Sequence, residues 1–344
     1  MTYRFIGLLL LIFVAAACSK KDDSEAGPGG SGGSQWLIPV EDIANLGDPM
    51  DVIPSIDQPA FDQLSKIELP ADERVLVYKH EGMVKVYPVT LLSNREIVND
   101  ITNDVYHAVT YCPVTGSGIN WKREINQSVT EFGVSGMLFH NNLMPYDRNT
   151  KSYWSQMLLK CVHGKLKGKD AETFFLMETV WETAQQYFPG ALVLVGDDQR
   201  AEAADPDIPE FKSGQSVSDT ANLKPGSLLF GLFSERKVKL YDYDDFDSGI
   251  TVFRDHFNYQ NLIVAGSKDL RFIVAFKTNG PASGKEFTAV QDRFPIIMKD
   301  RSGNYYDVFG YITEGPSTGE RLNFPVFYVA KLFAWKDFFD EIEF

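Results

Sequence analysis

The segment Val84-Lys85-Val86-Tyr87 is followed, 154 positions later, by Val238-Lys239-Leu240-Tyr241. Both segments carry the period-two pattern that is typical of a half-buried strand. Asp147-Arg148 returns as Asp300-Arg301 at an offset of 153. A nearly constant offset over so much of the chain indicates an internal duplication.

The duplication predicts the fold class. Gly164 and Gly168 return as Gly315 and Gly319, and a helix predicted over Glu172–Phe188 has a counterpart over Lys331–Phe338. Each half therefore contains several strands and then one helix. We predict a β-rich α+β fold made of two tandem related units, each with several mostly antiparallel strands followed by one helix.

The N-terminus has the features of a bacterial lipoprotein signal peptide over residues 1–17. A basic start is followed by the apolar run Phe5–Val14 and by Ala15-Ala16-Ala17-Cys18. A membrane-spanning helix needs about 20 apolar residues, so this run is too short to be one. We expect Cys18 to be acylated, as in a lipobox, with palmitate among its acyl chains; the alternative is a plain secretory signal with an incidental cysteine.

Residues 18–34 are predicted to be a flexible tether, because the run Gly27–Ser34 contains almost no side chain that could be buried. Ser19-Lys20-Lys21-Asp22-Asp23 resembles the tag that sends some Bacteroidetes lipoproteins to the cell surface. These features predict a lipid-anchored protein of the cell envelope and favour the outer membrane over the inner one. The tag would place it at the cell surface; the alternative is that these residues are part of an ordinary solvated linker.

The composition predicts a globular protein. The chain of 344 residues is 44% hydrophobic, and its net charge is −14. So negative a chain repels phosphate groups, which excludes nucleic acid as a partner and makes acyl chains at Cys18 the means of bilayer attachment. We predict a first unit over residues 35–196, an acidic linker over 197–226 and a second, degenerate copy of the unit over 227–344.

Cys112 is the first candidate for chemistry. It stands at the end of a predicted strand in Tyr111-Cys112-Pro113-Val114-Thr115-Gly116-Ser117, whose loop could present a thiol and backbone N–H groups to a small anion or a carbonyl. The second copy, read as Phe272–Phe276 running into Lys277, has no cysteine there. The alternative is a small buried hydrophobic residue before a turn. A disulfide between Cys112 and Cys161 is left open.

Further candidates are polar residues near this segment. Glu96 and Asp100 could act as a general acid and base, or simply be solvated or cap a helix. Ser135 lies in Gly133-Val134-Ser135-Gly136, whose small residues would let a ligand approach. Arg148 could bind a carboxylate or phosphate, although its presence in both copies favours a structural turn. No metal motif is complete.

The pieces Glu96–Asp100, Tyr111–Ser117, Phe132–Gly136 and Tyr146–Trp154 resemble, in this order, the bacterial domain-of-unknown-function family 3179. The resemblance implies a secreted or lipid-anchored protein and brings no reaction with it. Many members of that family carry His where this chain has Arg95, and some carry a second Cys at Thr115.

Three functions are compatible with these residues. We expect a membrane-anchored binding or accessory protein with an unidentified small ligand held in a cleft of the first unit, and no cofactor. The alternative is an extracytoplasmic enzyme that uses Cys112 as a nucleophile or redox centre. The third is a purely structural component of the envelope, which a large exposed apolar face would indicate.

Overall fold

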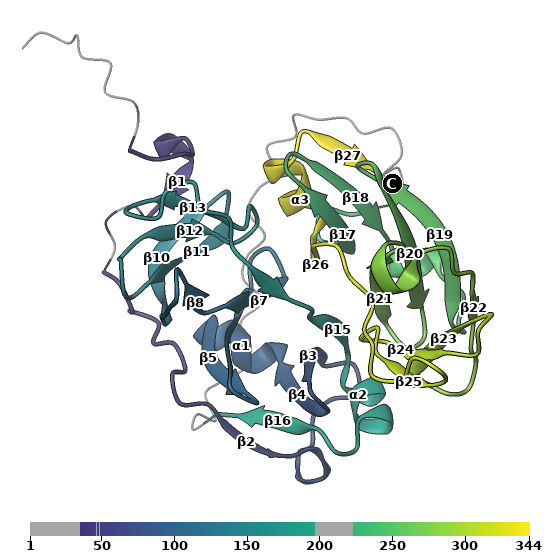
Figure 1. The fold of residues 1–344 in the computed structure, drawn as a ribbon. Helices are drawn as coiled ribbons and strands as arrows, with labels where there is room; N and C mark the ends of the chain where they lie inside the picture. Colours follow the sequence, from purple (N-terminus) through teal and green to yellow (C-terminus); the bar gives the residue numbers. More distant parts are fainter. Residues whose placement is uncertain (1–34, 46, 48, 197–222) are drawn as a thin grey trace, which may run out of the picture. The chain divides into compact units, whose positions relative to one another are not determined.

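The structure is a computed structural model, and it describes residues 35–45, 47, 49–196 and 223–344. The predicted signal peptide, the tether and most of the predicted linker lie outside these residues. The described residues form one compact unit. Most of its strands pair antiparallel, and the fold is α+β and β-rich, as predicted (Figure 1).

Three sheets are built mainly from the first half. One has the order β15-β3-β4-β16-β2, the next β14-β7-β6-β5, and the third β1-β10-β11-β12-β13. Their strands are β1 (Ile43–Ala44), β2 (Ala60–Gln63), β3 (Arg74–His80), β4 (Met83–Pro88), β5 (Ile97–Thr102), β6 (Val105–Cys112), β7 (Ser117–Lys122), β10 (Phe132–Phe139), β11 (Asn142–Asp147), β12 (Tyr153–Ser155), β13 (Lys160–His163), β14 (Thr173–Phe174), β15 (Met177–Val180) and β16 (Leu192–Val195). A hairpin of β8 (Glu124–Ile125) and β9 (Ser128–Val129) stands beside them.

Three further sheets come from the second half, in the orders β26-β17-β18-β27, β19-β20-β21 and β22-β23-β24-β25. Their strands are β17 (Leu228–Ser234), β18 (Lys237–Tyr241), β19 (Thr251–Phe257), β20 (Gln260–Ser267), β21 (Phe272–Lys277), β22 (Phe287–Ala289), β23 (Ile296–Asp300), β24 (Tyr305–Asp307), β25 (Ile312–Glu314), β26 (Phe327–Lys331) and β27 (Glu341–Glu343).

The two halves share one strand order. In β15-β3-β4-β16, the last strand is parallel to its neighbour, and β26-β17-β18-β27 repeats this order and these directions. In both halves a short helix joins the two outer strands, α2 (Trp181–Tyr187) and α3 (Leu332–Phe338). This is the arrangement that a duplication would produce; descent from one ancestral unit stays a prediction.

The helix predicted over Glu172–Phe188 is wrong in its first half. Residues there form β14 and β15, and only Trp181–Tyr187 is helical. Phe175, Met177 and Thr179 are buried in alternation, which is a period of two, because β15 pairs with the central strand β3. One further helix, α1 (Val89–Arg95), follows Pro88, whose φ of −62° suits a helix start.

Two of the hydrophobic clusters contain residues from both halves of the chain. One cluster joins Val77 and Phe175 to Phe276 and Leu322, and another joins Trp121 and Trp154 to Trp335. The β3 strand is buried on both faces, since Val75 and Val77 enter the first of these clusters while Leu76 and Tyr78 enter a different one. Among the described residues, no helix is long and apolar enough to span a membrane.

Candidate functional site

The described structure contains a cavity of about 640 Å³, which we call the open cavity. Its size is typical of sites for small organic ligands. Its lining residues come from both halves of the chain: Leu158, Leu159, Lys160, Asp170, Ala171, Phe233, Ser234, Glu235, Arg236, Phe257, Asn258, Gln260, Leu262, Lys277, Pro325 and Val326.

The open cavity combines an apolar wall with a few charges. Leu262 and Lys277 are cross-strand partners on β20 and β21, so their side chains point to the same face of the sheet. Three of the other four charged residues of the lining are in ion pairs, Lys160 with Asp170 and Arg236 with Asp340, and the fourth, Glu235, is exposed. None of the residues predicted from sequence as candidates lines this cavity.

Cys112, Thr115 and Ser117 lie together and are sealed from solvent, at 1%, 0% and 0% exposure. The Cys112 thiol donates to the Asn141 carbonyl oxygen at 3.6 Å. Cys112 and Cys161 are both free and buried, so no disulfide joins them.

The hydrogen bonds around Cys112 indicate where the hydroxyl protons of Thr115 and Ser117 point. The Asn142 amide nitrogen donates to the Thr115 and Ser117 hydroxyls at 2.8 and 3.0 Å, and that of Gln156 donates to Ser117 at 2.7 Å. Ser117 Oγ thus accepts two bonds, and its own proton must go to Thr115 Oγ1, 2.8 Å away. Thr115 Oγ1 then also accepts two bonds, so its proton points to Cys112 Sγ, with which Thr115 is hydrogen-bonded.

Burial outweighs these donors. It raises the pKa of the Cys112 thiol, and the nearby Glu96 carboxylate acts in the same direction, while hydrogen bonds from Thr115 oppose both. The thiol is therefore protonated at neutral pH. Burial also raises the pKa of Glu96 to about 7. Glu96 is thus near Cys112, as a catalytic pair would need, but both groups favour their uncharged forms.

Asp100 belongs to a different buried cluster. Lys85 donates to both its carboxylate oxygens, at 2.9 and 2.8 Å, and the Tyr87 hydroxyl donates at 2.6 Å. The second half repeats this arrangement, with Asp255 accepting from Lys239 and Tyr241, both at 2.7 Å. An arrangement present twice, with every charge paired, indicates a structural role.

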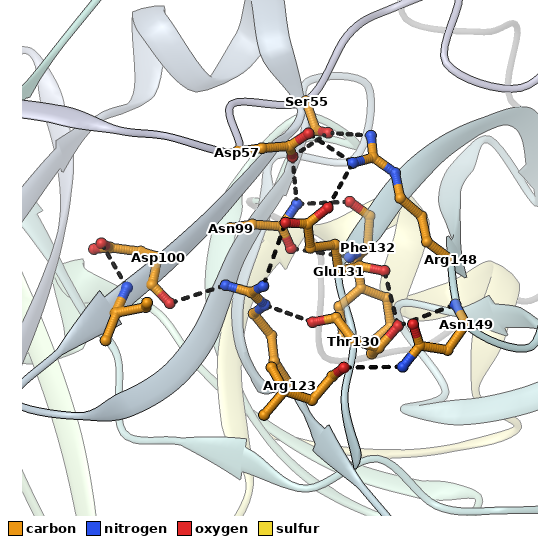
Figure 2. Close-up of polar contacts among 12 residues, drawn as sticks. Ser55, Asp57, Asn99, Asp100, Arg123, Thr130, Glu131, Phe132, Arg148 and Asn149 are labelled. Carbon is orange, nitrogen blue, oxygen red and sulfur yellow. Dashed lines mark hydrogen bonds and ion pairs between the residues drawn. The ribbon is translucent and has the colours of Figure 1, made fainter.

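Arg148 is also held by its neighbours (Figure 2). Its guanidinium donates to Asp57 at 2.6 Å, Glu131 at 2.9 Å and Ser55 at 2.9 Å. The Arg148 hydrogen bond helps to lower the pKa of Asp57, although burial opposes it. The arginine therefore fastens the segment that contains Ser55 and Asp57 to β10 and β11, and its donors are used within the protein.

Ser135 and Asp147 have backbone tasks. The Ser135 hydroxyl donates to the Met144 carbonyl and accepts from the Met137 N–H at the irregularity between β10 and β11. Asp147 accepts from the backbone N–H of Thr150, which is the turn predicted from its sequence.

The comparisons with known proteins identify the family. The family model described as "Protein of unknown function (DUF3179)" matches residues 50–342. The chain belongs to the DUF3179 family. No curated protein and no solved structure matches it.

Because the DUF3179 description names no activity, the function of this member has to be argued from its own residues.

The register of the strands corrects one sequence comparison: β6 corresponds to β20, not to β21. The hairpins pair Cys112 with Ser117 and Ser267 with Phe272, so Ser267 stands in the place of Cys112. The Leu270 N–H donates to Ser267 Oγ at 3.2 Å. A backbone N–H group close to the side chain at this position is therefore a feature of the turn in the second half.

Sequence reasoning missed Lys277 and the rest of the open cavity. The sequence did contain a signal, because Lys122 and Lys277 are 155 positions apart, close to the offset of the repeat. In the structure their backbone N–H groups donate to corresponding residues, Glu172 and Asn323, both at 2.8 Å. Among the described residues, no group of three or more His, Cys, Asp or Glu could hold a metal ion.

Proposed function

We propose that this DUF3179 protein is a lipid-anchored binding protein of the cell envelope that holds a small ligand in the open cavity. The observation that carries the proposal is this cavity of about 640 Å³, which far exceeds the space that packing leaves in a protein interior. The sequence supports the anchor through the lipobox-like Ala15-Ala16-Ala17-Cys18.

The equivalent place in the other half is packed with side chains, and we call it the filled counterpart. There Arg321 lies over the rings of Tyr311, Phe324 and Phe175, at 4.6, 5.1 and 5.4 Å from their centroids. The bridges Tyr311–Arg321 and Lys160–Asp170 correspond, so the short Asp170 takes the place of Arg321.

Val326 likewise takes the place of Phe175. Val326 lies opposite Phe233 on β17, since the Phe233 N–H donates to the Val326 carbonyl oxygen. Continuing the pairing of β15 with β3 by two residues places Phe175 opposite Lys79, which corresponds to Phe233 at an offset of 154. Two large side chains are therefore replaced by small ones, and the space that they fill in one half stays open in the other. A feature that only one half has supports a role in ligand binding.

Filling the open cavity tests the proposal. We expect Val326→Phe, which copies Phe175, to abolish binding of the neutral apolar dye N-phenyl-1-naphthylamine, measured by fluorescence. The full chain would carry Cys18→Ser, so that no acyl chain or detergent competes for the dye. Val129→Phe is the matched control, because Val129 is 41% exposed and lies on β9, away from the cavity. No dye binding by the parent chain, or equal binding by Val326→Phe, would refute the proposal.

The anchor is tested separately. We expect a labelled palmitate analogue to be incorporated into the chain in bacterial cells and to be lost in Cys18→Ser, with the protein released from the membrane fraction. Labelling that survives this substitution would show that Cys18 is not the acylated residue.

The enzyme reading has less support. A nucleophilic thiol needs access and a lowered pKa, whereas Cys112 is 1% exposed and burial raises its pKa.

A further inference from the structure

Lys277 differs from its counterpart in the first half in one respect, its charge partner. Lys122 forms an ion pair with Glu172, with 3.1 Å between Nζ and Oε2. The two lysines stand at corresponding places, since β7 pairs Lys122 with His107 and β21 pairs Lys277 with Leu262. Their backbone N–H groups also donate to corresponding residues, Glu172 and Asn323.

Asn323 cannot replace Glu172 as a charge partner. It carries a neutral amide, and this amide donates to the Asn279 side chain at 3.3 Å. Among the described residues, the Lys277 ammonium forms no ion pair, while Lys160 and Arg236 on the same cavity wall each have a carboxylate. Lys277 is half-buried at the end of β21, so part of its hydration is lost without compensation.

The surroundings of this ammonium are apolar. Leu262, at 1% exposure, lies directly across from it on β20, and Phe257, at 4%, is on the neighbouring strand β19. Phe233 and Val326 belong to the same lining. The open cavity therefore offers one unpaired positive charge next to an apolar wall.

We propose that the ligand of the open cavity is an apolar small molecule with a single carboxylate, and that Lys277 binds this carboxylate in the place that Glu172 occupies for Lys122. This inference rests on the proposed function and names its ligand class. A charge-assisted hydrogen bond is stronger than one between neutral groups, so the carboxylate contributes both affinity and orientation. The neutral amides of Asn258 and Gln260 add no competing negative charge, and the carboxylate of Glu235, which also lines the cavity, belongs to an exposed residue.

The test compares two ligands that share one apolar body. Decanoate and decan-1-ol would each displace N-phenyl-1-naphthylamine from the full chain carrying Cys18→Ser. We expect Lys277→Met to weaken decanoate binding about tenfold and to leave decanol binding unchanged, and Lys277→Arg to keep most of the decanoate affinity.

The matched control is Lys122→Met, which removes the corresponding lysine from the filled counterpart and should change neither ligand. If Lys277→Met leaves decanoate binding unchanged while Val326→Phe abolishes it, the cavity binds ligands and the carboxylate proposal is wrong. If the dye does not bind the parent chain at all, the proposed function fails and this inference fails with it.

Discussion

At the scale of single residues, Glu96 is held in an unusual state. It ends α1 with a backbone φ of 59°, a value that residues other than glycine rarely adopt, and its carboxyl group is largely buried. Its backbone is fixed on both sides, because its N–H donates to Leu92 and its carbonyl accepts from Tyr111. The side chain therefore has little freedom to reach water when it loses its proton.

This state predicts a dependence of stability on pH. The pKa of Glu96 is about 7 in the folded protein, above the value near 4.5 of the unfolded chain, so the folded state binds its proton more tightly. Stability should fall as pH rises from about 4.5 to 7, by at most about 3 kcal/mol. We expect Glu96→Gln to remove this loss: urea unfolding should show the variant more stable than the parent at pH 8 and equal to it at pH 4.

Glu124→Gln is the control for that experiment, because Glu124 is exposed and should give no pH-dependent difference. An equal gain for Glu96→Gln at pH 4 and pH 8 would mean that the charge of the carboxylate is not the cause.

The residue scale also shows why sequence located the candidate site only in part. Cys112, Thr115 and Ser117 do meet, because they belong to one hairpin, and hairpin neighbours can be predicted from spacing. Lys277 and Leu159 line one cavity although 118 positions separate them. A local sequence pattern cannot predict that two such distant residues line one cavity, because their contact depends on the tertiary arrangement.

At the scale of elements, strands were predicted better than helices. The predicted strand segments Val84–Tyr87 and Val238–Tyr241 lie in β4 and β18, and Cys112 ends the strand β6, as predicted. The helix over Glu172–Phe188 was overextended because Phe175 and Thr179 are four positions apart, which also fits a helical stripe. Pairing of β15 with β3 decides against the helix, and this pairing joins residues about 100 positions apart, as in Glu178 and Leu76.

The repeated sequence pattern was the most informative element-scale signal, although a duplication itself stays a prediction. It placed Asp147 and Asp300 at corresponding turns, and both carboxylates accept backbone N–H groups there, from Thr150 and from Ser302. What the repeat could not show is which side chains fill the space between strands. Phe175 and Val326 are both apolar in sequence, yet one packs a core and the other borders an opening.

At the scale of the whole molecule, the two halves are joined by shared cores. Phe175, from the first half and 2% exposed, contacts the rings of Phe327, Phe324 and Phe276 from the second, with centroids 5.0, 5.2 and 5.9 Å apart. The buried Tyr328 hydroxyl donates across the halves to the Met157 carbonyl at 2.6 Å. Such contacts couple the stability of each half to that of the other, since two of the hydrophobic clusters contain residues from both halves.

We therefore expect Phe175→Ala to destabilise both halves together, by about 3–5 kcal/mol, because it leaves a cavity in a core to which both contribute. Hydrogen exchange followed by mass spectrometry would report β4 and β18 separately, and protection in both strands should fall by the same factor. Phe253→Ala is the control: Phe253 is 37% exposed on β19, and its loss should cost about 1 kcal/mol or less. A fall confined to β4, with β18 unchanged, would show instead that the halves open independently.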